Sequence, residues 1–301
     1  EISGKVEVIP KLIDILDKDD FVEALRKYKP EVIFHAAAFK HVALLEDQPA
    51  KAVRNNVLAT HLLAALAQEN GVDFFVLIST DKAVDPSSVM GASKRLAERV
   101  IEGHAITANG IHFISVRFGN VLGSSGSVVP IFQKQIEEGG PVTVRGKTVS
   151  RFFMSIPEAA GLVITSAGLG VNGDQFILDM GKPIKILDLA YELIRLSGYE
   201  PELDIPISFI GVRPGEKKVE ELVLDSEQLD QTRHEKILVL KDGGMTDELL
   251  KALRPDLEDL ELDLSLHSAN QIRTKLSQIL PEYEPDLSSK EPVYLRIKAQ
   301  A

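Results

Sequence analysis

The amino-acid sequence contains no cysteine among its 301 residues. This absence excludes disulfides, thiol nucleophiles and cysteine-ligated metal sites, and it fits a reducing compartment. No group of histidine, aspartate and glutamate residues has the spacing of metal ligands, so we expect no metal. The apolar runs are far shorter than the roughly 18 residues that a membrane-spanning helix needs, and no signal peptide opens the sequence. These absences predict a soluble cytoplasmic protein.

Basic stretches interleaved with aromatic residues are missing as well, and the formal net charge is −11. Nucleic acid is therefore not an expected partner. An acidic protein can still bind an anionic ligand, because backbone N–H groups and a few arginines decide such binding locally. The share of charged residues is 26% and that of apolar residues is 44%, as in ordinary globular proteins, and the length suffices for one large core or two lobes.

The sequence also lacks a glycine motif for dinucleotide binding near its start. No GxGxxG or GxxGxxG pattern occurs before residue 100. Gly119, Gly123 and Gly126 resemble such a loop superficially, but they follow a late predicted strand rather than the first one. We interpret this glycine- and serine-rich segment as part of a substrate-binding lobe, with Asn120 and Ser127 as polar contacts. If the chain has a dinucleotide-binding fold, we expect its first strand, glycine loop and second strand to lie outside it.

Strands and helices alternate along the first part of the chain. The predicted strands cover 6–9, 31–34, 74–78 and 111–118, and the predicted helices cover 19–28, 49–70 and 86–103. This alternation predicts an α/β fold with a Rossmann-like parallel sheet and a smaller substrate-binding lobe. We assign 1–121 to a truncated dinucleotide-binding domain that is completed by 156–180, 122–240 to the substrate lobe, and 241–301 to an acidic tail. Two helical patterns in this tail, at 246–253 and 268–279, indicate a packing or assembly element.

Three of the predicted strands run into polar segments, HAAAFKH at 35–41, STDK at 79–82 and RFGN at 117–120. Ligands of open parallel sheets bind outside the carboxyl ends of the strands, so these segments predict one shared crevice. The alternative is that Asp81 and Lys82 form an ordinary solvated loop pair. Arg213 lies in a predicted turn, where a guanidinium suits a phosphate or a ribose, although a plain surface turn is the alternative.

The helix after STDK carries Met90 and Lys94, which are four residues apart and share a face. The segments HAAAFKHV, STDKAVDPSSVMGASK, VRFGNVLGSSGSVVPIF and IGVRPGEK resemble extended short-chain dehydrogenase/reductases that act on nucleotide sugars. They are most similar to UDP-N-acetylglucosamine 4,6-dehydratases of the CapD-like polysaccharide-biosynthesis group. The resemblance covers about residues 6–240 and does not obviously cover the tail.

This sequence departs from most of that superfamily at Met90, where a tyrosine usually acts as the acid–base group. A thioether exchanges no proton, so Met90 cannot take that role. The larger, membrane-anchored dehydratases of the group also carry methionine there. The resemblance therefore implies a fragment of a longer protein, the cytoplasmic domain of an inner-membrane enzyme, that lacks the N-terminal glycine loop.

The resemblance implies the NAD-dependent removal of water from UDP-N-acetylglucosamine to give a 4-keto-6-deoxy sugar nucleotide for polysaccharide biosynthesis. NAD is the expected cofactor, with NADP as the alternative, and the expected partners are a UDP-sugar and further copies of the chain. The resemblance implies that Asp81 acts on the 4-hydroxyl and the leaving group, and Lys82 on carbon 5. Thr80 would bind the sugar and Lys94 the nicotinamide ribose, with Met90 beside them, while His35 and His41 are interpreted as structural.

The remaining site residues also come from the resemblance. Those expected around the cofactor are Asp14, Ile15, Ala36, Ala37, Lys40, Asn56 and Lys94. Those expected around the UDP-sugar are Asn120, Ser127, Arg151, Arg213 and Glu216.

Two other functions stay open at this point. One is a nucleotide-sugar 4-epimerase or a dehydratase that inverts carbon 5, although such enzymes usually keep the tyrosine. The other is a catalytically inactive module that senses nucleotides. The joint presence of Thr80, Asp81, Lys82 and Lys94 argues against the second, because a sensor needs no proton relay.

Overall fold

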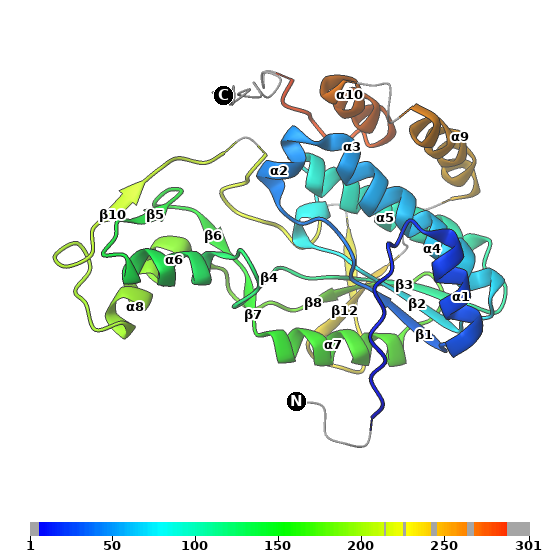
Figure 1. The fold of residues 1–301 in the computed structure, drawn as a ribbon, viewed down its shortest axis with the longest axis horizontal. Helices are drawn as coiled ribbons and strands as arrows, with labels where there is room; N and C mark the ends of the chain where they lie inside the picture. Colours follow the sequence, from blue (N-terminus) through cyan, green and yellow to red (C-terminus); the bar gives the residue numbers. More distant parts are fainter. Residues whose placement is uncertain (1–5, 214, 225–226, 242–245, 264–267, 288–301) are drawn as a thin grey trace, which may run out of the picture.

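A six-stranded sheet forms the centre of the molecule (Figure 1). The computed structural model describes residues 6–213, 215–224, 227–241, 246–263 and 268–287. The strands lie in the order β1 (Val32–His35), β2 (Phe74–Ile78), β3 (His112–Arg117), β8 (Gln175–Leu178), β12 (Ile237–Lys241) and β11 (Gln228–Gln231). The first four are parallel, which confirms the predicted Rossmann-like sheet, whereas β12 and β11 are antiparallel to their neighbours.

Helices cover both faces of this sheet (Figure 1). Along β2, Phe75 and Leu77 belong to the core on the side of α4 (Ala59–Glu69) and α5 (Val89–Ile106). Val76 between them belongs to the core on the side of α7 (Ile156–Leu169). Because successive side chains of a strand point to opposite faces, an unbroken apolar run is what a doubly covered strand requires.

The other helices of this half are α1 (Lys18–Tyr28), α2 (Val42–Asp47) and α3 (Pro49–Ala52). The long helix predicted over 49–70 is observed as α3 and α4 joined by a π-helical stretch, η1 (Val53–Leu58). The π-helical stretch contains Asn56, whose buried side chain binds another segment at the site.

The strand predicted over 6–9 is wrong. These residues are described without any strand, and the side chains of Val6 and Val8 are 63% and 62% exposed. A strand needs a hydrogen-bonded neighbour, and β1 is paired only with β2 among the described residues. Alternating apolar residues alone do not supply such a partner.

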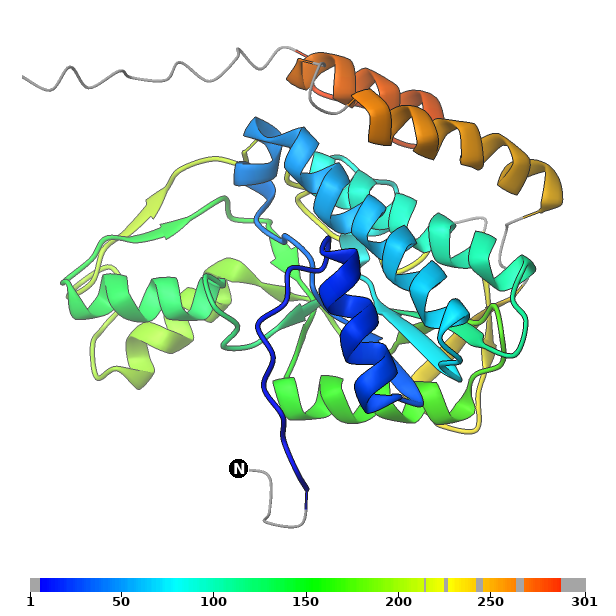
Figure 2. The same ribbon diagram turned by 45° about the vertical axis from the view of Figure 1, so that its right-hand side comes forward.

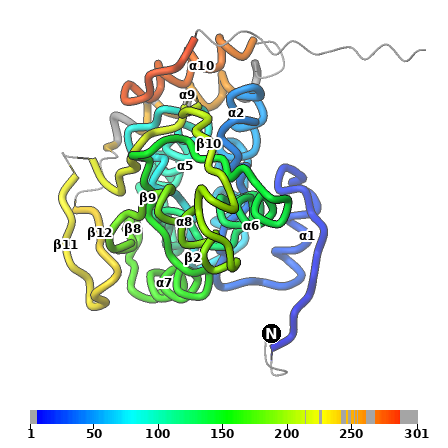
Figure 3. The backbone as a smooth tube through the Cα atoms, turned by 90° about the vertical axis from the view of Figure 1, so that its left-hand side faces the viewer, coloured from blue at the N-terminus to red at the C-terminus, as the bar shows by residue number. Residues whose placement is uncertain are grey.

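A smaller lobe lies beside the end of β3 (Figures 1 and 3). Its helices are α6 (Val128–Glu137) and α8 (Ile186–Leu196). Its strands pair two by two: β4 (Asn120–Val121) with β7 (Phe153–Met154), β5 (Val142–Val144) with β10 (Ile207–Phe209), and β6 (Ser150–Arg151) with β9 (Ile184–Lys185). The central sheet also contains β8, which lies within the segment 156–180 that is predicted to complete the dinucleotide-binding domain, and β11 and β12, which lie within the range 122–240 that is assigned to the lobe.

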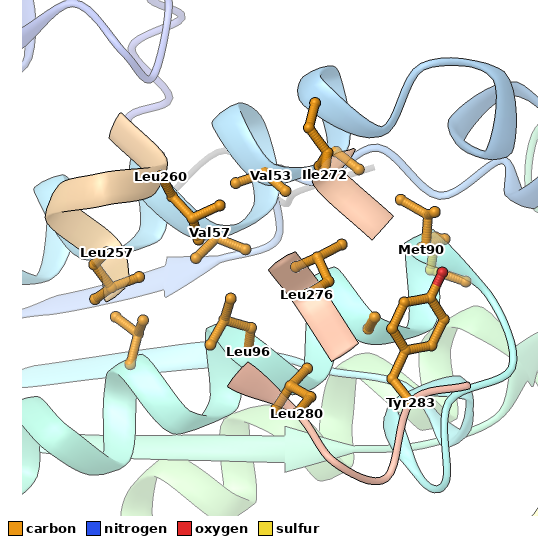
Figure 4. Close-up of a cluster of buried hydrophobic side chains, with 14 of the residues drawn as sticks. Val53, Val57, Met90, Leu96, Leu257, Leu260, Ile272, Leu276, Leu280 and Tyr283 are labelled. Atoms are coloured by element: carbon orange, nitrogen blue, oxygen red, sulfur yellow. The ribbon is translucent and has the colours of Figure 1, made fainter. Parts of the chain in front are cut away.

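The C-terminal hairpin consists of α9 (Asp247–Asp263) and α10 (Ala269–Ile279), and it packs on α3, η1 and α5 (Figure 2). Leu257 and Leu276 of the hairpin lie in one buried cluster with Val57 and Leu96 (Figure 4). The hairpin thus forms a further layer outside α5. No helix in the described ranges combines the length and the apolarity that crossing a bilayer requires.

Candidate active site

Asp81 and Lys82 lie directly past the end of β2, where the chain turns through a single 3-10 turn, η2 (Asp81–Ala83). The Asp81 side chain is completely buried and that of Lys82 is 21% exposed. Asp81 Oδ1 accepts hydrogen bonds from Thr80 Oγ1 at 2.8 Å and from Lys82 Nζ at 2.9 Å. Lys82 Nζ also donates to Asn120 Oδ1 at 3.1 Å, which links the ends of β2 and β3. The alternative of a solvated loop pair is therefore wrong.

The second carboxylate oxygen of Asp81, Oδ2, is buried and has no hydrogen-bond partner among the described residues. It lies against Gly119, where an added Cβ would be 3.3 Å from Oδ2 and 2.9 Å from Phe152 Cβ. A buried acceptor left unpaired costs about 1–3 kcal/mol. Such groups call for a functional explanation, and a ligand hydroxyl that donates to Oδ2 would satisfy this one.

A pocket of about 150 Å³ opens beside Lys82. Its charged lining residues are Lys82, Arg151, Glu216, Lys217 and Glu220. Three cations in so small a space suit an anionic ligand, since guanidinium and ammonium groups form charge-assisted hydrogen bonds with phosphate oxygens.

Glu220 and Lys217 are pocket residues that the sequence did not reveal. Glu220 is 5% exposed and lies 3.6 Å from Arg151 Nε. Burial raises the pKa of Glu220, and Lys82 opposes this shift. Lys217 Nζ donates to Val84 O at 3.3 Å, in the loop after η2. Lys217 is the last residue of the IGVRPGEK segment and Glu220 follows shortly after it, but only the tertiary fold brings this part of the chain to β2.

The predicted UDP-sugar residues divide into two groups. Arg151 lines the pocket and donates to the backbone oxygens of its neighbour Ser150 and of Lys217, and Asn120 holds Lys82. Glu216 also lines the pocket, and its carboxylate is 3.3 Å from Arg145 Nε. Arg213, in contrast, is exposed and is not among the described lining residues.

Ser127 lies at the N-terminus of α6 and makes no capping hydrogen bond with its side chain. Its hydroxyl is buried without a partner among the described residues.

Lys94 lies inside α5 with its ammonium turned toward the end of β2. Its Nζ donates to Ile78 O at 2.5 Å. Burial lowers the pKa of Lys94 to about 8, and the Glu98 carboxylate opposes this shift. Met90, one turn earlier, is 3% exposed and packs in the cluster that contains Tyr283 and the C-terminal hairpin (Figure 4).

Apart from Asn56 in η1 and Lys94 in α5, the predicted cofactor residues follow β1 or precede α1. Ala36, Ala37 and Lys40 are exposed in the loop after β1. Asn56 holds this loop, because its side chain accepts from Phe39 N at 2.8 Å and donates to Phe39 O at 3.0 Å. Its amide also donates to Ser93 Oγ of α5 at 2.9 Å, so the loop and the Lys94 helix are joined.

Asp14 is exposed and Ile15 is partly buried against the core. Burial, together with the charge of Lys94, lowers the pKa of His35 to about 4, and the His35 ring forms a hydrogen bond with Thr60 Oγ1 at 2.9 Å. A neutral, hydrogen-bonded ring supports the interpretation of His35 as a structural residue. His41 is exposed in front of α2, where an added Cβ on Gly126 would be 2.8 Å from its ring.

A second set of charges, the buried network, links β2, β3 and α5 through Arg95, Glu98 and Arg117. Arg117 donates to both oxygens of Glu98, at 3.1 Å and 2.9 Å, and Arg95 donates to one of them at 3.0 Å. Ser79, the residue before Thr80, donates to Glu98 Oε1 at 2.5 Å. Burial raises the pKa of Glu98, but the two arginines and Ser79 outweigh it and lower the pKa to about 2. The network thus anchors the strand end that carries the site.

No three acidic or histidine side chains in the described ranges converge in a way that could hold a metal ion. The site brings carboxylates, ammonium groups and guanidinium groups together at the carboxyl end of a parallel sheet.

Comparison with known proteins adds to this geometry. The model of a family described as "Polysaccharide biosynthesis protein" matches residues 2–242. The capsular polysaccharide biosynthesis protein CapD of Staphylococcus aureus is 52% identical over 235 residues, which are 78% of this chain and 39% of that relative. The chain therefore spans well under half the length of this relative.

Two solved structures share the fold. Pen from Bacillus thuringiensis is 33% identical with a TM-score of 0.71, and the match covers 78% of this chain and 72% of Pen. A DesIV double mutant from Streptomyces venezuelae, a dTDP-glucose 4,6-dehydratase with NAD and DAU bound, is 20% identical with a TM-score of 0.64. That match covers 70% of this chain and 69% of DesIV, and it shows the fold alone.

Proposed function

This chain belongs to the polysaccharide biosynthesis protein family that matches residues 2–242, and from that premise we propose that it is a nucleotide-sugar 4,6-dehydratase that uses NAD. The substrate we propose is UDP-N-acetylglucosamine, and the product is its 4-keto-6-deoxy derivative. The buried Asp81 supports this proposal most strongly, because one of its oxygens is held by Thr80 and Lys82 while the other is unpaired. A carboxylate with one oxygen held in this way and the other available is suited to accept a hydrogen bond from a substrate hydroxyl.

The difficulty of the reaction lies in the hydrogen on carbon 5, which is not acidic in the starting sugar. A ketone at carbon 4 makes it acidic. When bound, NAD would supply the hydride chemistry that this needs, as acceptor at carbon 4 and donor at carbon 6 within one turnover. The cofactor in DesIV is NAD. In this chain Lys94 is suited to bind a ribose. One of its three ammonium N–H groups donates to Ile78 O, and the other two have no hydrogen-bond acceptor among the described residues, so they can donate to ribose hydroxyls.

Asp81 handles the first proton. Oδ2 accepts the proton of the 4-hydroxyl as the ketone forms, and the same proton then leaves with the hydroxide of carbon 6 as water. Thr80 and Lys82 fix the carboxylate through Oδ1 while this happens. Asp81 therefore ends the cycle as it began, ionised.

Lys82 handles the second proton. As a neutral amine it removes the hydrogen of carbon 5 as a proton and returns it to that carbon when the hydride reaches carbon 6. A lysine gives up its proton more easily beside a neutral carboxylic acid than beside a carboxylate. Protonation of Asp81 by the 4-hydroxyl therefore prepares Lys82 for its task, since the two groups are 2.9 Å apart.

The test is to express Asp81→Asn and Lys82→Met variants of the complete protein with UDP-N-acetylglucosamine and NAD, and to follow the loss of one water by mass spectrometry. We expect each variant to be slower by about 100- to 10,000-fold, the usual contribution of a general acid or base. Asp85→Asn is the matched control, because Asp85 is an exposed carboxylate in the same loop and pairs with Lys217 alone among the residues that the structure describes. Normal turnover by both Asp81→Asn and Lys82→Met would show that these assignments are wrong.

The same experiment distinguishes other functions. A wild-type product of unchanged mass would indicate epimerisation rather than dehydration. Binding of UDP without any turnover would indicate a sensing module.

A further inference from the structure

Glu220 lies in the pocket beside Lys82 but has no part in the mechanism above. Its side chain is 5% exposed, although a carboxylate is seldom so deeply buried unless it is paired. The segment that carries it follows the pocket residues Gly215, Glu216 and Lys217, which come from outside the sheet. This segment brings a second carboxylate to a site that already contains Asp81.

The Glu220 carboxylate has one ion-pair partner and no hydrogen-bond donor among the described residues. Arg151 Nε is 3.6 Å away, and no described residue donates a hydrogen bond to either Glu220 oxygen. Arg151 in turn spends its Nη atoms on the backbone oxygens of Ser150, Lys217 and Lys218. A buried carboxylate that accepts no hydrogen bond is costly, and this one faces a pocket with room for water or a ligand.

The charges around Glu220 act on its carboxylate in opposite directions. Lys82, Arg151 and Lys217 stabilise its ionised form, whereas burial and Asp81 disfavour it, and Glu216 lines the same pocket. The balance raises the pKa of Glu220, with burial as the largest cause. A carboxylate in this position takes up a proton more readily than one in water.

We propose that Glu220 is an acid–base residue of this site that accepts the proton of Lys82, so that Lys82 can act on the substrate as a neutral amine. The inference rests on the proposed function of the site. The step is balanced: the Lys82 ammonium loses one proton and becomes an amine, and the Glu220 carboxylate gains it and becomes a carboxylic acid. Both groups line the same pocket, so a water molecule or a substrate hydroxyl bound there would carry the proton between them. After turnover the proton returns by the same route.

An internal transfer changes the position of a proton but not the number that the protein holds. The turnover rate of the wild type should therefore be nearly independent of pH around neutrality. In Glu220→Gln the proton of Lys82 must leave to solvent, so the rate should rise about tenfold per pH unit as the pH increases, until the amine is formed. The measurement is kcat against pH for the complete protein, from the mass of the dehydrated sugar nucleotide.

Two further variants make this test specific. Glu220→Asp keeps the carboxylate and should restore the flat profile, even if its rate is lower. Glu221→Gln is the matched control, because Glu221 is the adjacent residue, is 58% exposed and has Lys217 as its ion-pair partner in the described part of the chain, so its profile should stay flat. A Glu220→Gln profile as flat as that of the wild type would overturn the proposal, whatever its absolute rate.

A second measurement does not depend on turnover. The carboxyl carbon of Glu220 can be titrated by NMR, with Glu220→Gln used to identify its signal. Since Lys82 stabilises the ionised form, Lys82→Met should raise the pKa of Glu220 further. An unchanged titration would show that the two groups are not coupled and would overturn the proposal. A wild type that dehydrates no sugar nucleotide, with the coupling intact, would instead count against the proposed function.

Discussion

The buried network and the pocket are built from the same kinds of charged residue, yet they differ in how completely these charges are paired. In the network, both oxygens of Glu98 accept hydrogen bonds from Arg117, and Arg95 and Ser79 add one each. At the site, one oxygen of Asp81, next to the pocket residue Lys82, has no hydrogen-bond partner among the described residues, and Glu220 in the pocket accepts no hydrogen bond from any of them. The two regions are joined through Ser79 and Thr80, which are adjacent in the chain.

The difference separates charges that hold the fold together from charges that are free to act. Buried ions are tolerated when all their partners are present, and removal of one partner leaves the other uncompensated. Carboxylates with unused acceptors remain able to take up protons, which is what acid–base chemistry requires. The directions of the pKa shifts agree with this division, because the pKa of Glu98 is lowered to about 2 and that of Glu220 is raised.

The largest expected effect is that of Arg117→Met, which breaks the network. It leaves Glu98 buried beside a single arginine, Arg95, and a loss of about 3–5 kcal/mol in the free energy of unfolding is expected. Urea denaturation measures it. Arg195→Met is the control, because its ion pair with Glu192 is on the surface and is worth well under about 1 kcal/mol. If Arg117→Met and Arg195→Met lost equal amounts of unfolding free energy, the buried network would stabilise the fold no more than a surface ion pair does.

Lowering the pH should reduce the free energy of unfolding that Glu98 contributes, by somewhat less than the loss expected in Arg117→Met. The pKa of Glu98 is lowered from 4.5 to about 2 in the folded protein, so its ionised form stabilises the fold fully above pH 4.5. This contribution, on the order of 3 kcal/mol, is lost as the pH falls toward 2. Denaturation curves of the wild type and of Glu98→Gln should therefore converge with falling pH. Parallel curves over this range would contradict the role given to Glu98.

The smallest effect is expected in the pocket, and it has the opposite sign. A raised pKa means that ionised Glu220 costs the folded state free energy at neutral pH, so Glu220→Gln should leave the free energy of unfolding unchanged or raise it by less than about 1 kcal/mol. Arg151 keeps its backbone acceptors in this variant. Thermal and urea unfolding at neutral pH, with Glu98→Gln alongside, give the comparison directly. A large loss of stability in Glu220→Gln would place this residue with the network instead.

Much of the site could be predicted because strand ends are local features. The apolar run of β2 and the polar residues after it are contiguous, so the sequence alone placed Thr80, Asp81 and Lys82 at the carboxyl edge of the sheet. The structure adds the burial of Asp81 and the link from Lys82 to Asn120, which no local pattern contains. The ends of β2 and β3 meet through the hydrogen bond from Lys82 to Asn120, because parallel strands bring such ends together. That all three polar segments share one crevice stays a prediction, since Lys82 is the residue of these segments that lines the described pocket.

The residues that were missed depend on contacts between distant segments. Glu220 reaches the pocket from a stretch with no helix or strand of its own, so periodicity gave no signal. The partners in the network, Glu98 and Arg117, come from a helix and the following strand, and only packing shows that they meet. In contrast, the error at 6–9 came from a pattern that was present but had no neighbouring strand to pair with.

The C-terminal hairpin has a practical consequence for recombinant work. The family match stops at residue 242, which invites a truncation there. Such a shortened protein would lack Leu257, Leu276 and Tyr283, so the apolar side chains of Val57 and Leu96 would be exposed to water. Bare apolar patches of that kind drive precipitation. An expression boundary chosen from homology alone would therefore remove the layer that covers α5, the helix that carries Lys94.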